Sequence, residues 1–96
     1  MASITSASGP SGLSYVTTQD YAVVTACTFG SYANYASCTC TSGTVVGIGS
    51  GGSESGTKNY YMRCWAITNV TAGSTIRVGH ANVSSIWTTL CGATFA

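Results

Sequence analysis

Of the residue types in this 96-residue chain, cysteine can take part in the most kinds of chemistry. A cysteine can form a disulfide, hold a metal ion or act as a nucleophile. The count is odd, so intrachain pairing leaves at least one thiol over, and the sequence leaves the pairing pattern open. Cysteine density of this kind is typical of proteins that reach an oxidising environment. The candidates for a disulfide or an inter-subunit cross-link are Cys27, Cys38, Cys40, Cys64 and Cys91.

The closest spacing is Cys38-Thr39-Cys40. In an extended strand, residues two apart point to the same side, and a ring closed between these two sulfurs would be short and strained. A redox dithiol or half of a metal site is one reading. A zinc site usually shows a second closely spaced ligand pair, which the chain lacks, so we predict no metal and no cofactor. We expect Cys38 and Cys40 to link neighbouring subunits, and a pair within the chain to form among Cys27, Cys64 and Cys91.

Side chains suited to acid–base catalysis are few. His80 is the only histidine, and the surrounding Gly79-His80-Ala81-Asn82 is typical of a turn. Asp20 and Glu54 are the only carboxylates; Asp20 lies at an expected turn and Glu54 in a Gly/Ser segment where a catalytic acid would be poorly held. We therefore predict no catalytic residue and no enzyme. A cysteine-based redox or hydrolytic enzyme is the least favoured alternative.

Tyrosine is common, with six copies among the aromatic residues. Exposed Tyr beside Ser and Gly builds rigid, uncharged contact surfaces, and stacked aromatic rings also hold sugars. Ordinary cross-strand pairing within a sheet is the alternative. The candidate contact surface consists of Tyr32, Tyr35, Tyr60, Tyr61 and Trp65.

Charge is scarce: charged residues make up 5% of the chain and the net charge is +1. One Lys and two Arg cannot neutralise a run of phosphates, so we predict no nucleic-acid partner and no binding to anionic membranes. No apolar run approaches the ~20 residues that span a bilayer. A net charge near zero gives little repulsion between copies, so we expect the chain to associate with copies of itself and with other subunits.

The elements that must position these residues are strands. Short runs of β-forming residues alternate with Gly, Ser and Asn, which predicts an all-β fold, a small antiparallel β-sandwich or barrel. Met1–Gly12 is expected to be an extended N-terminal arm, disordered when isolated, and residues 13–96 a single β domain. We predict a loop at Gly49–Gly56 and a turn at Thr71–Ser74. The predicted strands are Leu13–Thr18, Ala22–Phe29, Tyr32–Thr41, Thr44–Ile48, Lys58–Val70, Thr75–Val78 and Val83–Phe95.

Alternation along these strands sorts side chains into faces. In Ala22–Phe29, Val24 and Ala26 share one face, while Cys27 and Phe29 share the other. In Lys58–Val70, one face carries Tyr61, Arg63, Trp65 and Ile67, and the other carries Tyr60, Met62, Cys64 and Ala66. In Val83–Phe95, one face carries Ile86 and Leu90, and the other carries Trp87 and Cys91.

In composition and in its N-terminal arm, the chain resembles the small β-rich structural proteins of tailed-phage virions, such as capsid decoration proteins and tail components. We expect no export signal, because Met1–Ser6 has neither the basic region nor the apolar region of such a signal, and the resemblance agrees with this expectation. Virion proteins assemble in the host cytoplasm and meet an oxidising exterior after lysis. The resemblance implies a non-enzymatic structural subunit of an extracellular particle, with the arm lying on a neighbour. The alternative is a small secreted, disulfide-stabilised binding module, lectin-like, whose Tyr and Trp side chains would contact a glycan.

Overall fold

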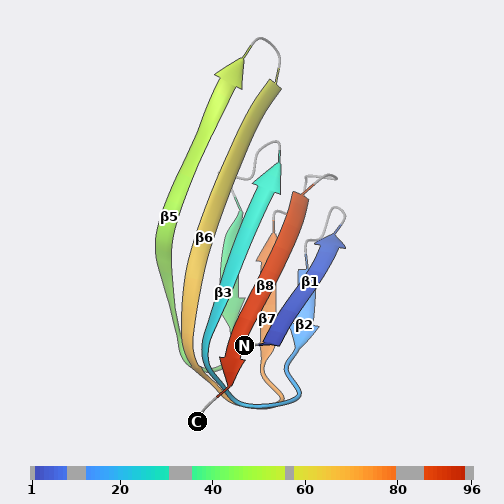
Figure 1. The fold of residues 1–96 in the computed structure, drawn as a ribbon, viewed down its shortest axis with the longest axis vertical. Helices are drawn as coiled ribbons and strands as arrows, with labels where there is room; N and C mark the ends of the chain where they lie inside the picture. Colours follow the sequence, from blue (N-terminus) through green and yellow to red (C-terminus); the bar gives the residue numbers. More distant parts are fainter. Residues whose placement is uncertain (1, 9–12, 31–35, 56–57, 80–85, 95–96) are drawn as a thin grey trace.

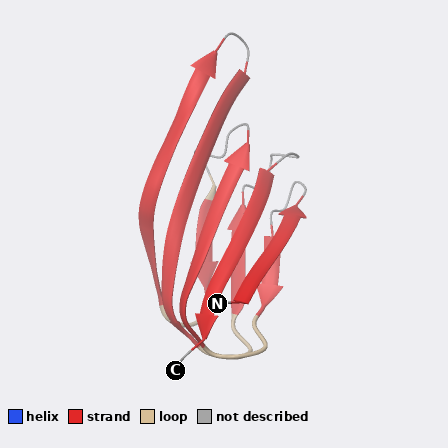
Figure 2. Cartoon of the chain, in the orientation of Figure 1, coloured by secondary structure: helices blue, strands red, loops and turns tan. Residues whose placement is uncertain are grey.

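The computed structural model describes residues 2–8, 13–30, 36–55, 58–79 and 86–94. Every regular element among them is a strand, and no helix occurs in these ranges (Figures 1 and 2). The strands form two antiparallel sheets packed face to face, which confirms the all-β prediction and selects the sandwich over the barrel. Figure 1 shows the smaller sheet behind the lower part of the larger one.

The larger sheet has five strands and the smaller has three. The order of the five-stranded sheet is β1 (Ala2–Ser8), β8 (Ile86–Thr94), β3 (Tyr21–Gly30), β6 (Lys58–Val70) and β5 (Thr44–Ser55). The order of the three-stranded sheet is β2 (Leu13–Val16), β7 (Thr75–Gly79) and β4 (Ser37–Cys40). Most neighbours in space are therefore far apart in sequence, and β8 at the end of the chain lies between β1 and β3.

The expected N-terminal arm is an edge strand for most of its length. Ala2–Ser8 is extended and pairs with β8, from Ala2 opposite Gly92 to Ser8 opposite Ile86. Without it, the outer edge of β8 would present a row of unpaired backbone N–H and C=O groups, and any extended segment can satisfy such a row. The arm is thus a strand of the chain's own sheet.

The predicted loop at Gly49–Gly56 is wrong over most of its length. β5 continues to Ser55, and its pairing with β6 runs to Ser55 opposite Lys58. Glycine is depleted in strands because it has no side chain to pack and loses much backbone freedom, but its backbone hydrogen-bonds normally. The register shifts between Gly47 and Gly49, which makes Ile48 a bulge. The resulting β5–β6 hairpin extends beyond the other strands (Figure 1), and the molecule is 47 Å long.

The core lies between the two sheets and follows the predicted alternation. Val24 and Ala26 of β3 are buried, whereas Cys27 and Phe29 on the opposite face are not. Leu90 is likewise buried and Trp87 exposed. The buried apolar cluster consists of Tyr21, Val24, Ala26, Ala36, Trp65, Ile67, Val70, Ile76, Val78 and Leu90.

Hydroxyl groups fix the predicted turn at Thr71–Ser74, which the structure confirms. Thr17 Oγ1 donates to the carbonyl oxygen of Thr71 (3.0 Å) and accepts from the backbone N–H of Ser74 (3.1 Å). Ser42 Oγ accepts from the Thr71 N–H (3.1 Å), and Asp20 Oδ1 accepts from the N–H of Ala72 (2.8 Å). Asp20 therefore holds a turn, together with the hydroxyl groups of Thr17 and Ser42.

Candidate functional site

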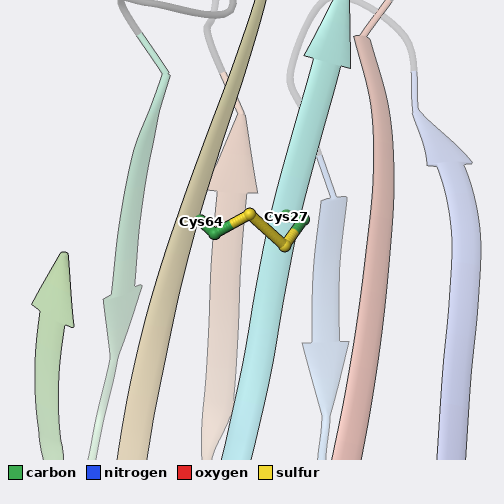
Figure 3. Close-up of a disulfide and its surroundings, with 2 residues drawn as sticks. All are labelled: Cys27 and Cys64. Atoms are coloured by element: carbon green, nitrogen blue, oxygen red, sulfur yellow. A yellow bond between two sulfur atoms is a disulfide. The ribbon is translucent and has the colours of Figure 1, made fainter. Parts of the chain in front are cut away.

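The reactive sulfurs of the described chain divide into two groups on opposite sides of the five-stranded sheet. Cys27 on β3 lies directly opposite Cys64 on β6, and the two form a disulfide across the pair of strands (Figure 3). This pairing is one of those the sequence left open. The bridge closes a sequence separation of 37 residues and lies on the face that points away from the smaller sheet. We call that side of the five-stranded sheet the outer face.

Cys91 is the third cysteine on the outer face. It lies opposite Thr25 on β3, while Cys27 lies opposite Thr89 on β8, so Cys91 is one diagonal step from Cys27 on the same side of the sheet. Cys91 is partly buried and carries a thiol rather than a disulfide. The strand order thus brings together three cysteines that are separated by dozens of residues in the chain.

Cys38 and Cys40 lie on β4 and face the core between the sheets. Both are partly buried and pack against the apolar cluster. Burial raises the pKa of the Cys38 thiol from 9.0 to about 11, and the neighbouring Cys40 adds to the rise. Because the thiolate is the reactive form, Cys38 is a slow nucleophile at neutral pH. The expected link from this pair to another subunit stays a prediction, and its geometry is unfavourable.

The predicted aromatic contact surface is wrong at Trp65. This side chain is only 6% exposed and belongs to the core. Its neighbour Arg63 places the guanidinium 5.3 Å from the Trp65 ring centroid and donates from Nη1 to the carbonyl oxygen of Ala36 at 3.0 Å. Tyr61 is partly buried. Tyr32 and Tyr35, like the side chain of Tyr60, lie outside what the structure describes. Alternation groups residues by face, but it does not reveal which face a second sheet covers.

Large apolar side chains are exposed on the outer face instead. Trp87, Phe29 and Met62 form one row across β8, β3 and β6, because Phe29 lies opposite both of the others. They are 65%, 51% and 50% exposed, respectively. Val23 on β3 and Val46 on β5 add further exposed apolar area. No charged side chain is described on this face.

The sequence contains a signal for this row in the alternation of two strands. Phe29 and Trp87 each share a predicted face with a cysteine, and each is the largest apolar residue on its strand's non-core face. The strand order that places them side by side comes from pairing between distant segments.

The other candidate chemistry finds no site in the described ranges. No group of three or more His, Cys, Asp and Glu side chains there is placed to hold a metal ion. His80 lies outside the described residues, as does the side chain of Glu54. The described elements include no helix that could cross a membrane. Comparison of the chain with family models, with curated proteins and with solved structures gives no match.

Proposed function

We propose that this protein is a non-enzymatic structural subunit of an extracellular assembly, and that copies of the chain associate through the outer face. The supporting observation is the combination found there: a row of exposed Trp87, Phe29 and Met62 with no charged side chain described around it. Contiguous exposed apolar patches of large size on soluble proteins usually mark contact sites.

The size of the outer face suits a specific contact. Five strands about 4.8 Å apart, each contributing about seven residues, cover roughly 24 by 23 Å, or on the order of 550 Å² in projection. Accessible area exceeds projected area because side chains stand up from the sheet. The outer face therefore offers about the 600 Å² that each partner buries in a small specific interface.

A second copy of the chain is the occupant that the charge distribution favours. In a two-fold contact the same patch meets itself, so any charge on the patch would approach a like charge. The described outer face carries none, and the net charge of +1 gives little long-range repulsion between copies. Two sheets packed in this way would lie about 10 Å apart and interdigitate their side chains.

The oligomeric state tests this proposal. Light scattering coupled to size-exclusion chromatography, run over a wide range of loading concentrations, should give a mass of two or more chains that falls on dilution. A mass of one chain at every concentration would contradict self-association.

The finer proposal is that the assembly is a phage virion in which the chain serves as a decoration or tail protein. Its support is the composition described above and a disulfide typical of proteins exposed to an oxidising exterior. Mass spectrometry of purified particles, released from the host by lysis, should detect the chain at a fixed ratio to the major capsid or tail protein. Its absence from washed particles would exclude this location.

The exposed ring of Trp87 beside Phe29 also favours the alternative, a secreted lectin-like module whose aromatic row stacks on a sugar. This alternative predicts a chain that is monomeric at all concentrations and whose tryptophan fluorescence changes on titration with a glycan. The light-scattering experiment and this titration give opposite results under the two proposals.

A further inference from the structure

We propose that Cys91, Cys27 and Cys64 form a thiol–disulfide exchange site, in which the Cys91 sulfur attacks the Cys27–Cys64 bridge of its own chain. The inference rests on the positions of the three sulfurs and does not depend on self-association.

All three sulfurs occupy the same side of the sheet on three consecutive strands, β8, β3 and β6. Cys27 is the middle member, directly opposite Cys64 and one diagonal step from Cys91. Diagonal neighbours on antiparallel strands lie about 7–8 Å apart, with their Cβ atoms somewhat closer, and each cysteine sulfur stands one bond beyond its Cβ. Rotation about the Cα–Cβ bond of either cysteine brings the two sulfurs nearer.

The direction of approach favours attack on Cys27. A thiolate displaces a disulfide from the side opposite the leaving sulfur. Cys64 lies on β6, at one edge of β3 (Figure 3). Cys91 lies on β8, which pairs with the other edge of β3. Cys91 thus approaches the Cys27 sulfur from the side away from Cys64, and Cys64 is the sulfur that leaves.

The exchange is balanced without an oxidant or a reductant. The Cys91 thiol loses its proton to water, and its thiolate forms a bond to Cys27 Sγ. The bond between Cys27 Sγ and Cys64 Sγ breaks, and its electron pair stays on Cys64 Sγ, which takes up a proton from water. One disulfide and one thiol remain, but the cross-strand tie has moved from β3–β6 to β3–β8 and the thiol has moved from β8 to β6.

Cys38 and Cys40 are poor competitors for this exchange. They lie on β4 in the other sheet, on the core side, with the five-stranded sheet between them and the outer-face bridge. Mutating either of them therefore provides a matched control, because it removes a thiol of the same chain without touching the three-sulfur site.

The positions of the basic residues make the exchange directly measurable. Cleavage by trypsin after Lys58, Arg63 and Arg77 places Cys27, Cys64 and Cys91 in three separate peptides, 1–58, 64–77 and 78–96. The oxidised full-length chain is incubated at mildly alkaline pH, its remaining thiols are blocked with a maleimide, and the non-reduced digest is analysed by mass spectrometry. A Cys38→Ser/Cys40→Ser background leaves Cys27 as the only cysteine of the first peptide.

We expect two linked pairs, 1–58 with 64–77 and 1–58 with 78–96. The peptide left out of each pair should carry the maleimide: 78–96 on Cys91 beside the first pair, and 64–77 on Cys64 beside the second. Cys91→Ser should lose the second pair and keep the first. In Cys64→Ser, oxidation with glutathione disulfide should yield the 1–58 with 78–96 pair. The proposal is overturned if the parent chain gives only the first pair, or if Cys64→Ser leaves both Cys27 and Cys91 open to maleimide while Cys91→Ser still forms its bridge.

Discussion

Thr28 on β3 and Thr88 on β8 lie directly opposite each other on the core side of the sheet, and neither hydroxyl has a hydrogen-bond partner within the described part of the chain. Both side chains are 1% exposed. A buried hydroxyl without a partner loses its hydrogen bonds to water and gains none in return. The middle of the sandwich therefore contains a polar pair that lowers its stability.

Replacing either hydroxyl with a methyl group should stabilise the fold. We expect Thr28→Val and Thr88→Val each to raise the free energy of unfolding by about 1 kcal/mol, because the shape is kept and the desolvation penalty is removed. Thr17→Val is the matched control: Thr17 is equally buried, but its Oγ1 makes two hydrogen bonds in the Thr71–Ser74 turn. It should lower stability by about 1–3 kcal/mol. Urea denaturation followed by tryptophan fluorescence measures all three, and equal losses in the three variants would contradict the argument.

Gly92 on β8 lies beneath the ring of Tyr21. A Cβ built on Gly92 would come within 2.6 Å of Tyr21 Cδ1 and 2.7 Å of Cε1, and the ring is fully buried. Gly92→Ala should therefore destabilise the fold by about 1–3 kcal/mol, the usual range for overpacking in a core. Gly51→Ala is the control, because Gly51 is also a strand glycine but a Cβ there meets nothing within 4 Å. Thermal unfolding should show a clear drop in the midpoint for the first variant and little change, or a small gain, for the second.

The strands whose alternation could be read from the sequence are those with one covered and one open face. β3 is an example: Val24 and Ala26 face the core, whereas Cys27 and Phe29 lie on the open face, because only every second residue is buried. The prediction for Trp65 is wrong because alternation separates the two faces of a strand but does not say which of them the second sheet covers. The sequence predicts too short a strand at β5 because glycines favour a turn locally, whereas pairing with β6 keeps the segment extended. The three-sulfur site depends on the order β8-β3-β6, which no local pattern encodes.

The Cys38 thiol should make stability fall at alkaline pH. Its pKa in the folded chain is about 11, against 9.0 ordinarily, because of burial and of Cys40 beside it. Above pH 9.0 the unfolded chain releases this proton while the folded chain still holds it, so the unfolded state is favoured progressively as pH rises from 9.0 to about 11. Below pH 9.0 both states are protonated and the contribution is constant.

Comparison with Cys38→Ala isolates the contribution of the Cys38 thiol, because every other ionisable group is common to the two chains. We expect the free energy of unfolding of the parent chain to decline more steeply over that interval than that of the variant, with parallel curves below it. Parallel curves throughout would show that the thiol is not held in its neutral form by the fold. The slopes are compared rather than the absolute stabilities, so a general loss of stability in Cys38→Ala leaves the test intact.

The outer face should control self-association through its aromatic row. Trp87→Ser and Phe29→Ser remove large apolar side chains that are more than half exposed, so the fold should tolerate them. Each should weaken association at least about tenfold, because buried aromatic side chains contribute most of the binding energy at such contacts. Val16→Ser is the matched control: Val16 is 57% exposed but lies on β2 of the other sheet. Sedimentation equilibrium gives the three dissociation constants. If Val16→Ser weakens association as much as Trp87→Ser does, the contact is a general effect of exposed apolar area and the outer face is not the specific interface.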